Sequence, residues 1–407
     1  MGRLAGLLLG SAVLLQVILV SRPPWLEPAV GCDRLFRLHR YLGFAIGPLF
    51  LLHPSLLIVG NARRHHVALG QQFMDLAEDW PHVRLATIAF LLVVPTILSS
   101  LPMIRKRLSH EAWHLPHLTM YLALGLASLH QVNGAELSSR PWVTGYWVAL
   151  HGFVFSGFVA RRIGRPLLNF ARHRFRIDRI VSESDDVISV YLTGRRLDRF
   201  TFRAGQYVNV SFLSKGLWTP HPFSFSAAPN GRFVRLSIKA VGDFTRRARE
   251  LPPGTSALLE GPLGAFTTRT STRHKFLMVA GGIGITPIRA LVESLDPERR
   301  DVVLLYAAKT RNDLVFASEL RALTARCHFI LSRPSDTRAT AEHPSDSWTA
   351  DRSQHGRLDQ NTLITLVPDL KNRDVFVCGP PPMMTAMIGA LRRLQVPESQ
   401  IHYEQFS

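Results

Sequence analysis

Cysteine is scarce in this chain of 407 residues, which has only three: Cys32, Cys327 and Cys378. Their wide spacing excludes a disulfide framework and a zinc motif, both of which need cysteines at short, regular intervals. The soluble part of the chain is therefore expected in a reducing compartment, the cytoplasm. Internal repeats and signals for prenylation or myristoylation are lacking too, so neither a repeat protein nor a lipid-anchored one is indicated.

Acidic residues are few as well. The chain has 30 Asp and Glu against 48 Lys and Arg, which gives a net charge of +18 and a pI of about 10.8. A charge of this size is one signature of nucleic-acid binding. Here, however, the basic residues gather at the ends of apolar segments, as in 105–107 and 161–165, and then scatter. That distribution is typical of the cytoplasmic ends of membrane helices, so we expect no nucleic-acid partner.

Charged residues make up 19% of the chain, below the roughly 25% usual in soluble domains, and hydrophobic residues reach 46%. A membrane-spanning helix needs about 20 apolar residues. Five stretches approach or exceed that length: 4–20, 35–60, 83–104, 113–132 and 142–160. The first is short, and Arg22-Pro23-Pro24 follows it in place of a small-residue cleavage site, which favours an uncleaved anchor over a signal peptide.

These stretches predict a multi-pass protein of the cell membrane whose first domain, 1–163, is a bundle of about five helices. The mean hydropathy of +0.09 is too low for a chain that lies wholly in the membrane, so a soluble part is expected as well. Arg172 and Arg174 mark the cytoplasmic edge after the last stretch. The same rule puts 105–107 inside and the N-terminus outside, although Arg63 and Arg64 then fall outside.

The soluble part contains two kinds of pattern. Short alternating segments at 173–182, 187–193, 206–213 and 233–239 predict strands of an antiparallel β-barrel over 164–270. From Lys275 onward, strands and helices alternate, which predicts a parallel α/β sheet over 271–407. The alternating segments are 275–280, 285–295, 302–308, 314–323, 327–332, 373–378 and 381–395. Residues 333–357 are polar and rich in Ser, Asp and Pro, and are expected to form a surface loop.

Two of the apolar stretches each carry a pair of histidines. His39 and His53 are fourteen residues apart, and His117 and His130 thirteen. At 1.5 Å per residue each pair spans about 20 Å, too far to share one small metal ion. Two neighbouring helices would instead form two separate His/His pairs, each able to hold a haem iron from both sides. A step of thirteen turns the second ring about 140° away in a straight helix, so the later helix would need a distortion. Ordinary helix–helix hydrogen bonding is the simpler alternative.

The segments Leu38-His39-Arg40-Tyr41-Leu42, Leu52-His53-Pro54 and Trp113-His114-Leu115-Pro116-His117, with Leu129-His130, resemble the haem helices of the ferric reductase and NADPH oxidase superfamily. The resemblance implies two b-type haems, one between His39 and His117 and one between His53 and His130. It also implies that Arg37, Arg40 and Arg105 contact the propionates of the inner haem, where lipid headgroups are the alternative. The family usually has six spanning helices, one more than the five counted here.

The segment His221-Pro222-Phe223-Ser224-Phe225-Ser226 resembles the flavin-binding motif of the same family, which implies FAD. An aromatic ring and a hydroxyl on alternating positions of one strand can both lie against the isoalloxazine, with the Ser224 hydroxyl near its reactive N5. As a bare pattern this is also an ordinary strand. Further along, Lys239, Gly242 and Thr245 fit the family in order, and Gly242 and Thr245 would offer donors to the FAD pyrophosphate.

A glycine-rich turn follows the strand 276–279. It contains Gly281, Gly282, Gly284, Thr286 and Pro287 and opens a predicted helix. Glycines there let a pyrophosphate approach the backbone, and the helix N-terminus supplies donors. The turn resembles the nicotinamide-binding motif of ferredoxin-reductase-like proteins.

Three further segments resemble parts of the same module. Lys309 and Arg311 follow a strand where family members hold the 2′-phosphate of NADPH, and solvated charges are the alternative. Asp313 is the nearest acid, so a preference for NADH is not excluded. The Cys378-Gly379-Pro380 turn would lie beside the nicotinamide, and Phe406 would cover the flavin. Ser224, Cys378 and Phe406 are therefore the candidate catalytic residues.

The resulting hypothesis is an oxidoreductase with its FAD and NADPH domains in the cytoplasm. NADPH would give a hydride to FAD, and electrons would pass singly through two haems to an outside acceptor such as dioxygen or a ferric chelate. A protein partner is left open. Two alternatives remain: a membrane-anchored flavin reductase that recruits a partner, and a metal-ion transporter with a regulatory flavin domain.

Overall fold

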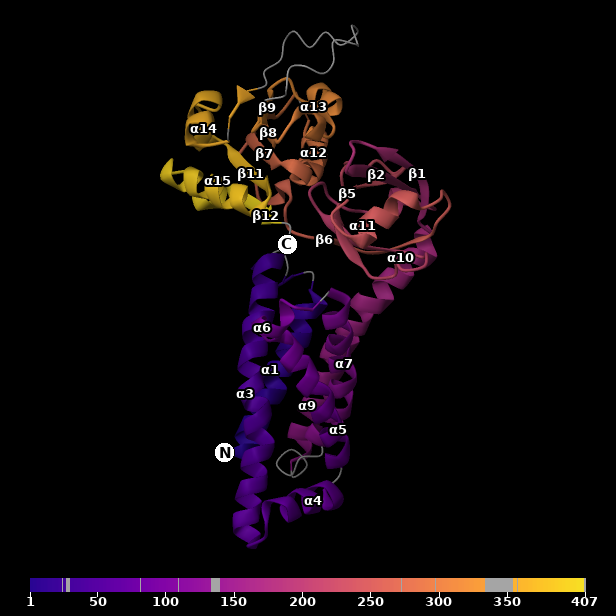
Figure 1. The fold of residues 1–407 in the computed structure, drawn as a ribbon, viewed down its shortest axis with the longest axis vertical. Coiled ribbons are helices and arrows are strands. Elements are labelled where there is room, and N and C mark those ends of the chain that lie inside the picture. The colour runs from indigo at the N-terminus through magenta and orange to yellow at the C-terminus, as the bar shows by residue number, and fades with distance from the viewer. Residues whose placement is uncertain are drawn as a thin grey trace. The chain divides into compact units, whose positions relative to one another are not determined.

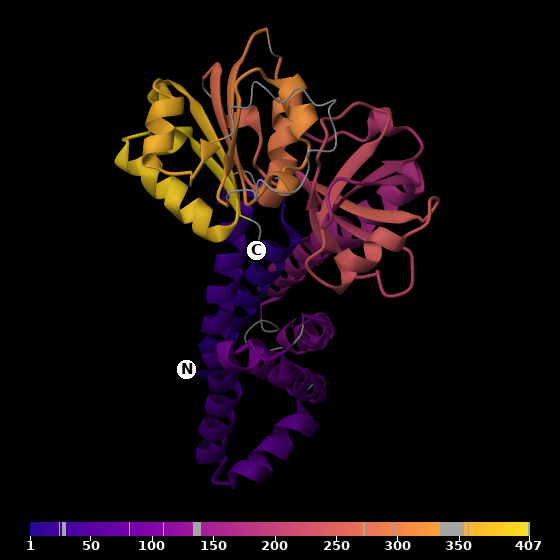
Figure 2. The same ribbon diagram turned by 45° about the horizontal axis from the view of Figure 1, so that its top comes forward.

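The computed structural model describes every residue except 24, 27–29, 81, 109, 133–139, 272, 297, 334–353, 357 and 406–407. It divides into two compact units, one formed mainly by 33–161 with the N-terminal helix and the other mainly by 162–407. The expected surface loop lies largely outside the described residues. The two units are visible in Figures 1 and 2.

The first unit is helical, as the long apolar stretches predict. Its helices are α1 (Gly2–Ser21), α3 (Cys32–His65), α4 (Leu69–Asp79), α5 (Val83–Ser100), α6 (Pro102–Arg105), α7 (His110–Val132) and α9 (Pro141–Val159). Among the described residues, four helical stretches are long and apolar enough to cross a membrane: Gly2–Ser21, Arg34–His65, Val83–Ser100 and Pro141–His173. The fifth expected span is α7, a 23-residue helix that falls outside this set.

Close helix contacts hold this unit together. Buried Ala89 and Val93 of α5 pack against Ala123 of α7, and Phe50 of α3 stacks on Phe90 of α5 with ring centroids 4.5 Å apart. Small residues at such contacts let helix backbones approach closely in a membrane. Helices α5 and α7 thereby form one packed pair.

A π-helical turn at Ala160–Gly164 spans the boundary between the units, and α10 (Arg165–His173) and the flavin-type domain follow it. Its strands are β1 (Arg176–Ser182), β2 (Val187–Thr193), β3 (Tyr207–Phe212), β4 (His221–Ser224), β5 (Val234–Lys239) and β6 (Ala257–Leu263), with α11 (Asp243–Arg247) between the last two. They form two three-stranded antiparallel sheets, β1-β2-β5 and β4-β3-β6. Fully buried Phe175, Phe212 and Phe225 lie in their common core, each contributing about 1.5–3 kcal/mol by burial.

The third domain is a six-stranded parallel sheet in the order β10-β9-β8-β7-β11-β12. Its strands are β7 (Lys275–Gly281), β8 (Asp301–Ala308), β9 (Cys327–Leu331), β10 (Gln354–His355), β11 (Asp374–Gly379) and β12 (Ile401–Gln405). Its helices are α12 (Ile285–Ser294), α13 (Ala317–Leu323), α14 (Gln360–Leu366) and α15 (Pro381–Arg393). The predicted α/β alternation is confirmed.

Helices cover both faces of this sheet, with α12 and α13 on one side and α14 and α15 on the other (Figures 1 and 2). Alternate residues of β7 separate accordingly: Met278 joins the core under α12, and Leu277 and Val279 join the core under α15. Because helices cover both faces of the sheet, side chains on both sides of each strand are buried. The strand sequences are therefore continuous apolar runs.

Gly205 and Gly254 provide a matched pair of positive-φ glycines, with φ of +87° and +86°. A Cβ on Gly205 would lie 1.9 Å from the Phe266 carbonyl oxygen, whereas a Cβ on Gly254 meets nothing within 4 Å. We predict that Gly254→Ala costs about 1–2 kcal/mol of backbone strain alone, and that Gly205→Ala costs about 1–3 kcal/mol more because the backbone must move. Thermal unfolding of the full chain in detergent measures both, and equal losses would contradict the close approach.

Candidate functional site

The four predicted histidines lie in two pairs across α3 and α7. The rings of His39 and His117 have centroids 6.2 Å apart, and so do those of His53 and His130. All four side chains are half-buried. Pairing therefore occurs in the combination that the sequence predicted.

The thirteen-residue spacing in α7 does not prevent the second pair. A straight helix would turn His130 about 140° from His117, yet each ring reaches its partner on α3. Pro116 lies inside α7 next to His117, and Pro48 and Pro54 lie inside α3. Proline removes a backbone donor and is the usual site of a helix kink. Pro116 precedes both histidines of α7, so it does not by itself account for the angle between them; the structure shows that both rings reach their partners on α3.

His53 is held by the N-terminal helix. Its Nδ1 lies 2.9 Å from the carbonyl oxygen of Gly2. Because a carbonyl oxygen only accepts, Nδ1 carries the proton and Nε2 keeps its lone pair. Gly6 of the same helix permits this approach, since a Cβ there would lie 2.6 Å from the imidazole. The short first helix thus positions a histidine, a role that the sequence did not indicate.

The other pair has different neighbours. The Trp113 ring stacks on His117 with centroids 4.8 Å apart, and its Nε1 donates to the Ser100 hydroxyl at 3.2 Å. The Arg105 guanidinium lies 4.7 Å from the centre of the same indole. The Nδ1 atoms of His39 and His117 are buried and have no hydrogen-bond partner among the described residues.

Ser224 ends strand β4, which pairs with β3 so that Tyr207 lies opposite Ser224. Its side chain is buried, with 4% of the residue exposed, and its hydroxyl has no partner among the described residues. The next strand residues toward the amino end are Phe223, Pro222 and His221, and the His221 ring stacks on Phe244 of α11 at 3.8 Å. An unpaired buried hydroxyl is costly without a ligand, so Ser224 suits contact with a bound polar group.

Three other predicted flavin contacts are used by the protein itself. The Thr245 hydroxyl accepts from the backbone N–H of Gly242 at 2.9 Å and donates to the Gly242 carbonyl. These bonds close the turn before α11. Lys239 forms an ion pair with Asp186 at 3.0 Å. Gly242 and Thr245 thus shape the turn, and their contact with a pyrophosphate stays a prediction.

The glycine-rich turn packs directly on the Cys378-Gly379-Pro380 turn. A Cβ on Gly284 would lie 2.4 Å from the Cys378 carbonyl oxygen, and one on Gly281 would lie 3.0 Å from Pro380 Cδ. Gly282 has a positive φ of +52° and nothing within 4 Å of its Cβ position. Thr286 donates to the Ile283 carbonyl at 3.0 Å and, with Pro287, is buried at the start of α12. Two predicted motifs, nearly a hundred residues apart, thus form one site.

Glu404 belongs to this site, although the sequence did not single it out. It pairs with Cys378 in the register of β11 and β12, and its Oε1 lies 3.5 Å from the Cβ position of Gly264. The same position lies 2.9 Å from the Tyr207 ring, so Gly264 joins the flavin-type strands to the Cys378 turn. Burial, and to a lesser degree the Glu404 carboxylate, hold the pKa of the Cys378 thiol well above its usual value.

Lys309 and Arg311 follow β8 and are exposed. The Asp313 carboxylate accepts two hydrogen bonds, one from the Thr310 N–H at 2.9 Å and one from the Thr310 hydroxyl at 2.7 Å. It therefore caps its own turn. Phe406, expected over the flavin, lies outside the described residues.

Three family models match consecutive parts of the chain. The ferric reductase like transmembrane component matches 5–128, an FAD-binding domain matches 172–264, and an oxidoreductase NAD-binding domain matches 278–388. Each matched part lies within one domain of the fold described above.

Relatives and a solved structure share parts of this arrangement. The glycine betaine monooxygenase reductase subunit of Chromohalobacter salexigens is 26% identical over 58% of this chain, and the chain covers 64% of its length, less than two thirds. A flavohemoprotein of Burkholderia sp. is 30% identical over 69% of this chain and 72% of its own. The flavohemoglobin structure from Malassezia yamatoensis has a TM-score of 0.50 at 17% identity, covering 98% of this chain and 94% of that one, which shows a shared fold.

Gly284→Ala tests the packing of the two turns. The new methyl group would overlap the Cys378 carbonyl, so we predict that the turn shifts and that the buried Cys378 thiol becomes alkylated at least about tenfold faster, as expected for a group released from burial. Peptide-resolved mass spectrometry after iodoacetamide treatment measures this. Cys327 on β9, where burial raises the thiol pKa to about 12, is the internal control. Equal acceleration at both thiols would indicate general unfolding.

Proposed function

We propose that this chain, which belongs to the ferric reductase and NADPH oxidase superfamily, carries electrons from NADPH through FAD and two b-type haems to an acceptor outside the cell. Its domains make it an NAD(P)H- and FAD-dependent oxidoreductase with a membrane component of the ferric reductase type. The finer proposal depends above all on one observation, the two histidine pairs with ring centroids 6.2 Å apart.

That distance fits two histidine rings that bind one metal ion from opposite sides. An imidazole nitrogen binds a first-row metal at about 2.0 Å and lies about 1.1 Å from its ring centre, so two rings on opposite sides of one iron are about 6.2 Å apart. Both pairs match it. A metal-bound histidine usually donates its other ring N–H to a carbonyl or carboxylate oxygen. The Nδ1–H of His53 makes such a hydrogen bond to the Gly2 carbonyl. His39 and His117 would hold the inner haem, and His53 and His130 the outer one.

When bound, FAD accepts a hydride from the nucleotide and returns the electrons one at a time to haem. The chain's own residues bind and orient. The unpaired Ser224 hydroxyl suits the flavin N5, and the Cys378 and glycine turns together form the floor for the nicotinamide half of the nucleotide. The raised pKa of Cys378 keeps its thiol neutral beside them. Phe406 is proposed to cover the flavin.

Charge supports the membrane orientation. We propose a multi-pass protein of the cell membrane, with domains 1–163 in the membrane and 164–270 and 271–407 in the cytoplasm. Half-buried Arg161 and exposed Arg165 follow the end of the apolar run of α9, as the positive-inside rule favours for the cytoplasmic side.

The acceptor is proposed to be dioxygen or a ferric chelate. Arg63, Arg64, His65 and His66 are exposed at the outer end of α3, and a positive surface there would attract an anionic ferric chelate. NADPH oxidation by purified protein with either oxygen or ferric citrate, followed by assays for superoxide and ferrous iron, distinguishes the two. The transporter alternative finds less support, since about 20 Å of helix separates the two histidines of each helix, too far for one small metal ion.

Haem binding is tested with His53→Leu against His151→Leu. His151 is also a buried membrane-helix histidine, but it bonds Trp147 and lies outside both pairs. We predict that His53→Leu lowers the haem-to-protein ratio from about two to about one, because one iron loses an axial ligand. Outside reduction should collapse, since about 21 Å of helix then separates the inner haem from the outer site. His151→Leu should keep both haems. A pyridine haemochrome assay gives the ratio, and two haems in His53→Leu would remove the outer-haem assignment.

Nucleotide preference is tested with Lys309→Ala/Arg311→Ala. We predict that the KM for NADPH rises about tenfold, because charge-assisted contacts to the 2′-phosphate are lost, while the KM for NADH stays unchanged. Arg299→Ala/Lys371→Ala is the matched control, since it removes the same charge at the amino ends of the strands, far from the nucleotide turn. If the unmodified protein already prefers NADH, the assignment of these two residues is wrong.

A further inference from the structure

Two arginines are buried where the flavin-type domain meets the nucleotide domain. Arg235 lies on β5 and is 3% exposed, and Arg289 lies on α12 and is 7% exposed. Charged side chains are almost never this buried unless they are paired. The contacts of both arginines are therefore expected to serve a role that offsets the cost of burying their charge.

Arg235 reaches across the domain boundary. Its Nη1 donates to Glu319 Oε1 at 3.0 Å and to the Tyr191 hydroxyl at 3.1 Å, and its Nη2 donates to the Ser226 carbonyl at 3.1 Å. Its guanidinium also lies 4.4 Å from the centre of the Phe316 ring. Glu319 and Phe316 belong to the nucleotide domain, whereas Tyr191 and Ser226 belong to the flavin-type domain.

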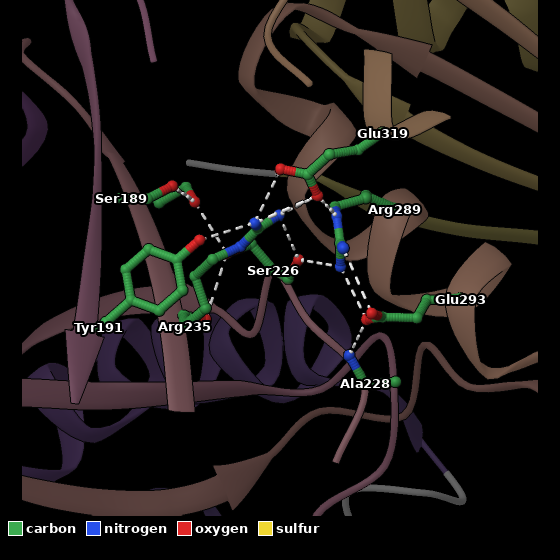
Figure 3. A network of polar contacts seen from close by, with 9 residues as sticks. Ser189, Tyr191, Ser226, Ala228, Arg235, Arg289, Glu293 and Glu319 are labelled. Carbon is green, nitrogen blue, oxygen red and sulfur yellow. Dashed lines mark hydrogen bonds and ion pairs between the residues drawn. The ribbon is translucent and has the colours of Figure 1, made fainter. Parts of the chain in front are cut away.

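Arg289 belongs to the nucleotide domain and contacts the flavin-type domain. Its Nε donates to Glu319 Oε2 at 2.6 Å, and its Nη1 donates to the Ser226 carbonyl at 2.9 Å and to Glu293 Oε2 at 2.7 Å. Glu293 in turn accepts from the Ala228 backbone N–H. Both arginines thus share one carboxylate from the nucleotide domain and one carbonyl from the flavin-type domain, as Figure 3 shows. We call Tyr191, Ser226, Ala228, Arg235, Arg289, Glu293 and Glu319 the Arg–Glu network.

The network has no net charge. Two guanidinium groups face two carboxylates, and both carboxylates are about one-third exposed while both guanidinium groups are buried. Burial alone would raise the pKa of Glu319, but the hydrogen bonds from Arg235 and Arg289 outweigh it and hold that pKa below its usual value. Glu319 therefore stays ionised at neutral pH, and both arginines stay paired.

The backbone that presents Glu319 is strained. Phe316 precedes α13 with a φ of +62°, a conformation that is a rare outlier for a bulky residue. It persists because Phe316 is buried and packs against the Arg235 guanidinium. Strain of this kind marks places where the surrounding contacts over-determine the backbone.

The network acts on both halves of the proposed hydride-transfer site. Ser226 lies two residues after Ser224, on the segment that presents the hydroxyl to the flavin. Arg289 lies on α12, three residues after Thr286 and directly beyond the glycine turn that would hold the nucleotide. A shift at either arginine therefore changes the separation between flavin and nicotinamide.

We propose that the Arg–Glu network is a positioning device that sets the distance between the bound flavin and the bound nicotinamide, with Arg235, Arg289 and Glu319 as positioning residues. The proposal rests on the proposed function, in which a nicotinamide nucleotide reduces FAD. None of the three residues takes part in the chemistry. They hold the two domains in the one arrangement in which the hydride can move.

A second buried network offers a control. Arg373 is 1% exposed, and its Nε donates to Asp369 at 2.7 Å while its Nη2 donates to Asp301 at 2.6 Å. All three residues belong to the nucleotide domain. Arg373→Lys therefore disturbs a buried arginine with two carboxylate partners without touching the boundary between domains.

The test compares Arg235→Lys with Arg373→Lys in the full chain with FAD bound, in detergent. Thermal unfolding, the anaerobic rate of flavin reduction at saturating NADPH, and the flavin–nicotinamide charge-transfer absorbance are measured. Both variants should unfold at lower temperature. Only Arg235→Lys should lose charge-transfer absorbance and reduce its flavin about tenfold to a hundredfold more slowly, with KM little changed, because a misplacement of about 1 Å has that effect.

Glu319→Gln is the second variant, should Arg235→Lys fail to fold. It keeps the shape and an acceptor oxygen and removes only the charge, and it should show the same loss of rate and absorbance. Parental reduction rate and absorbance in whichever variant folds would overturn the positioning role and leave the proposed function intact. If neither NADPH nor NADH reduces the flavin of the unmodified protein, the proposed function fails, and the positioning role fails with it.

Discussion

The membrane unit depends on imidazole rings that face each other across two helices. A polar ring inside an apolar bundle is unfavourable unless a hydrogen bond or a ligand satisfies it, and the rings of His39–His117 and His53–His130 face each other across α3 and α7. Other contacts surround these rings. Gly6 lets the first helix approach His53, and Trp113 stacks on His117. A cofactor that binds both rings of a pair would find its ligands already in place.

In the second unit the corresponding constraint is close approach of backbone to backbone. Gly205 lies against the Phe266 carbonyl and Gly284 against the Cys378 carbonyl, where no side chain has room. These contacts bring together segments from different strands and determine where the nucleotide turn lies. Thr245 closes its own turn through two hydrogen bonds with Gly242.

The Arg–Glu network adds charged contacts to the apolar ones, such as that of Phe266 with Phe376, which join the flavin-type and nucleotide domains. Buried ion pairs are a poor source of stability, because desolvation opposes the attraction. Their directional bonds, however, define one arrangement of the partners far more sharply than apolar packing does. Two guanidinium groups that share one carboxylate and one carbonyl leave little freedom for the domains to slide. An oxidoreductase in which a flavin and a nicotinamide must meet needs such a defined arrangement.

The sequence by itself determined the order of domains, most of the strands and helices, and the residues of the main motifs, because these follow from local periodicity and from turns that need glycine or proline. It also indicated the histidine pairs, since ionisable residues in apolar helices stand out. Tertiary structure alone decided the rest. Both rings of α7 met their partners on α3, the sheet register put Glu404 beside Cys378, and Arg235 bonded to Glu319, which lies 84 residues away in the chain. Such contacts join residues far apart in the chain, and no local pattern encodes which distant side chains will meet once the elements pack.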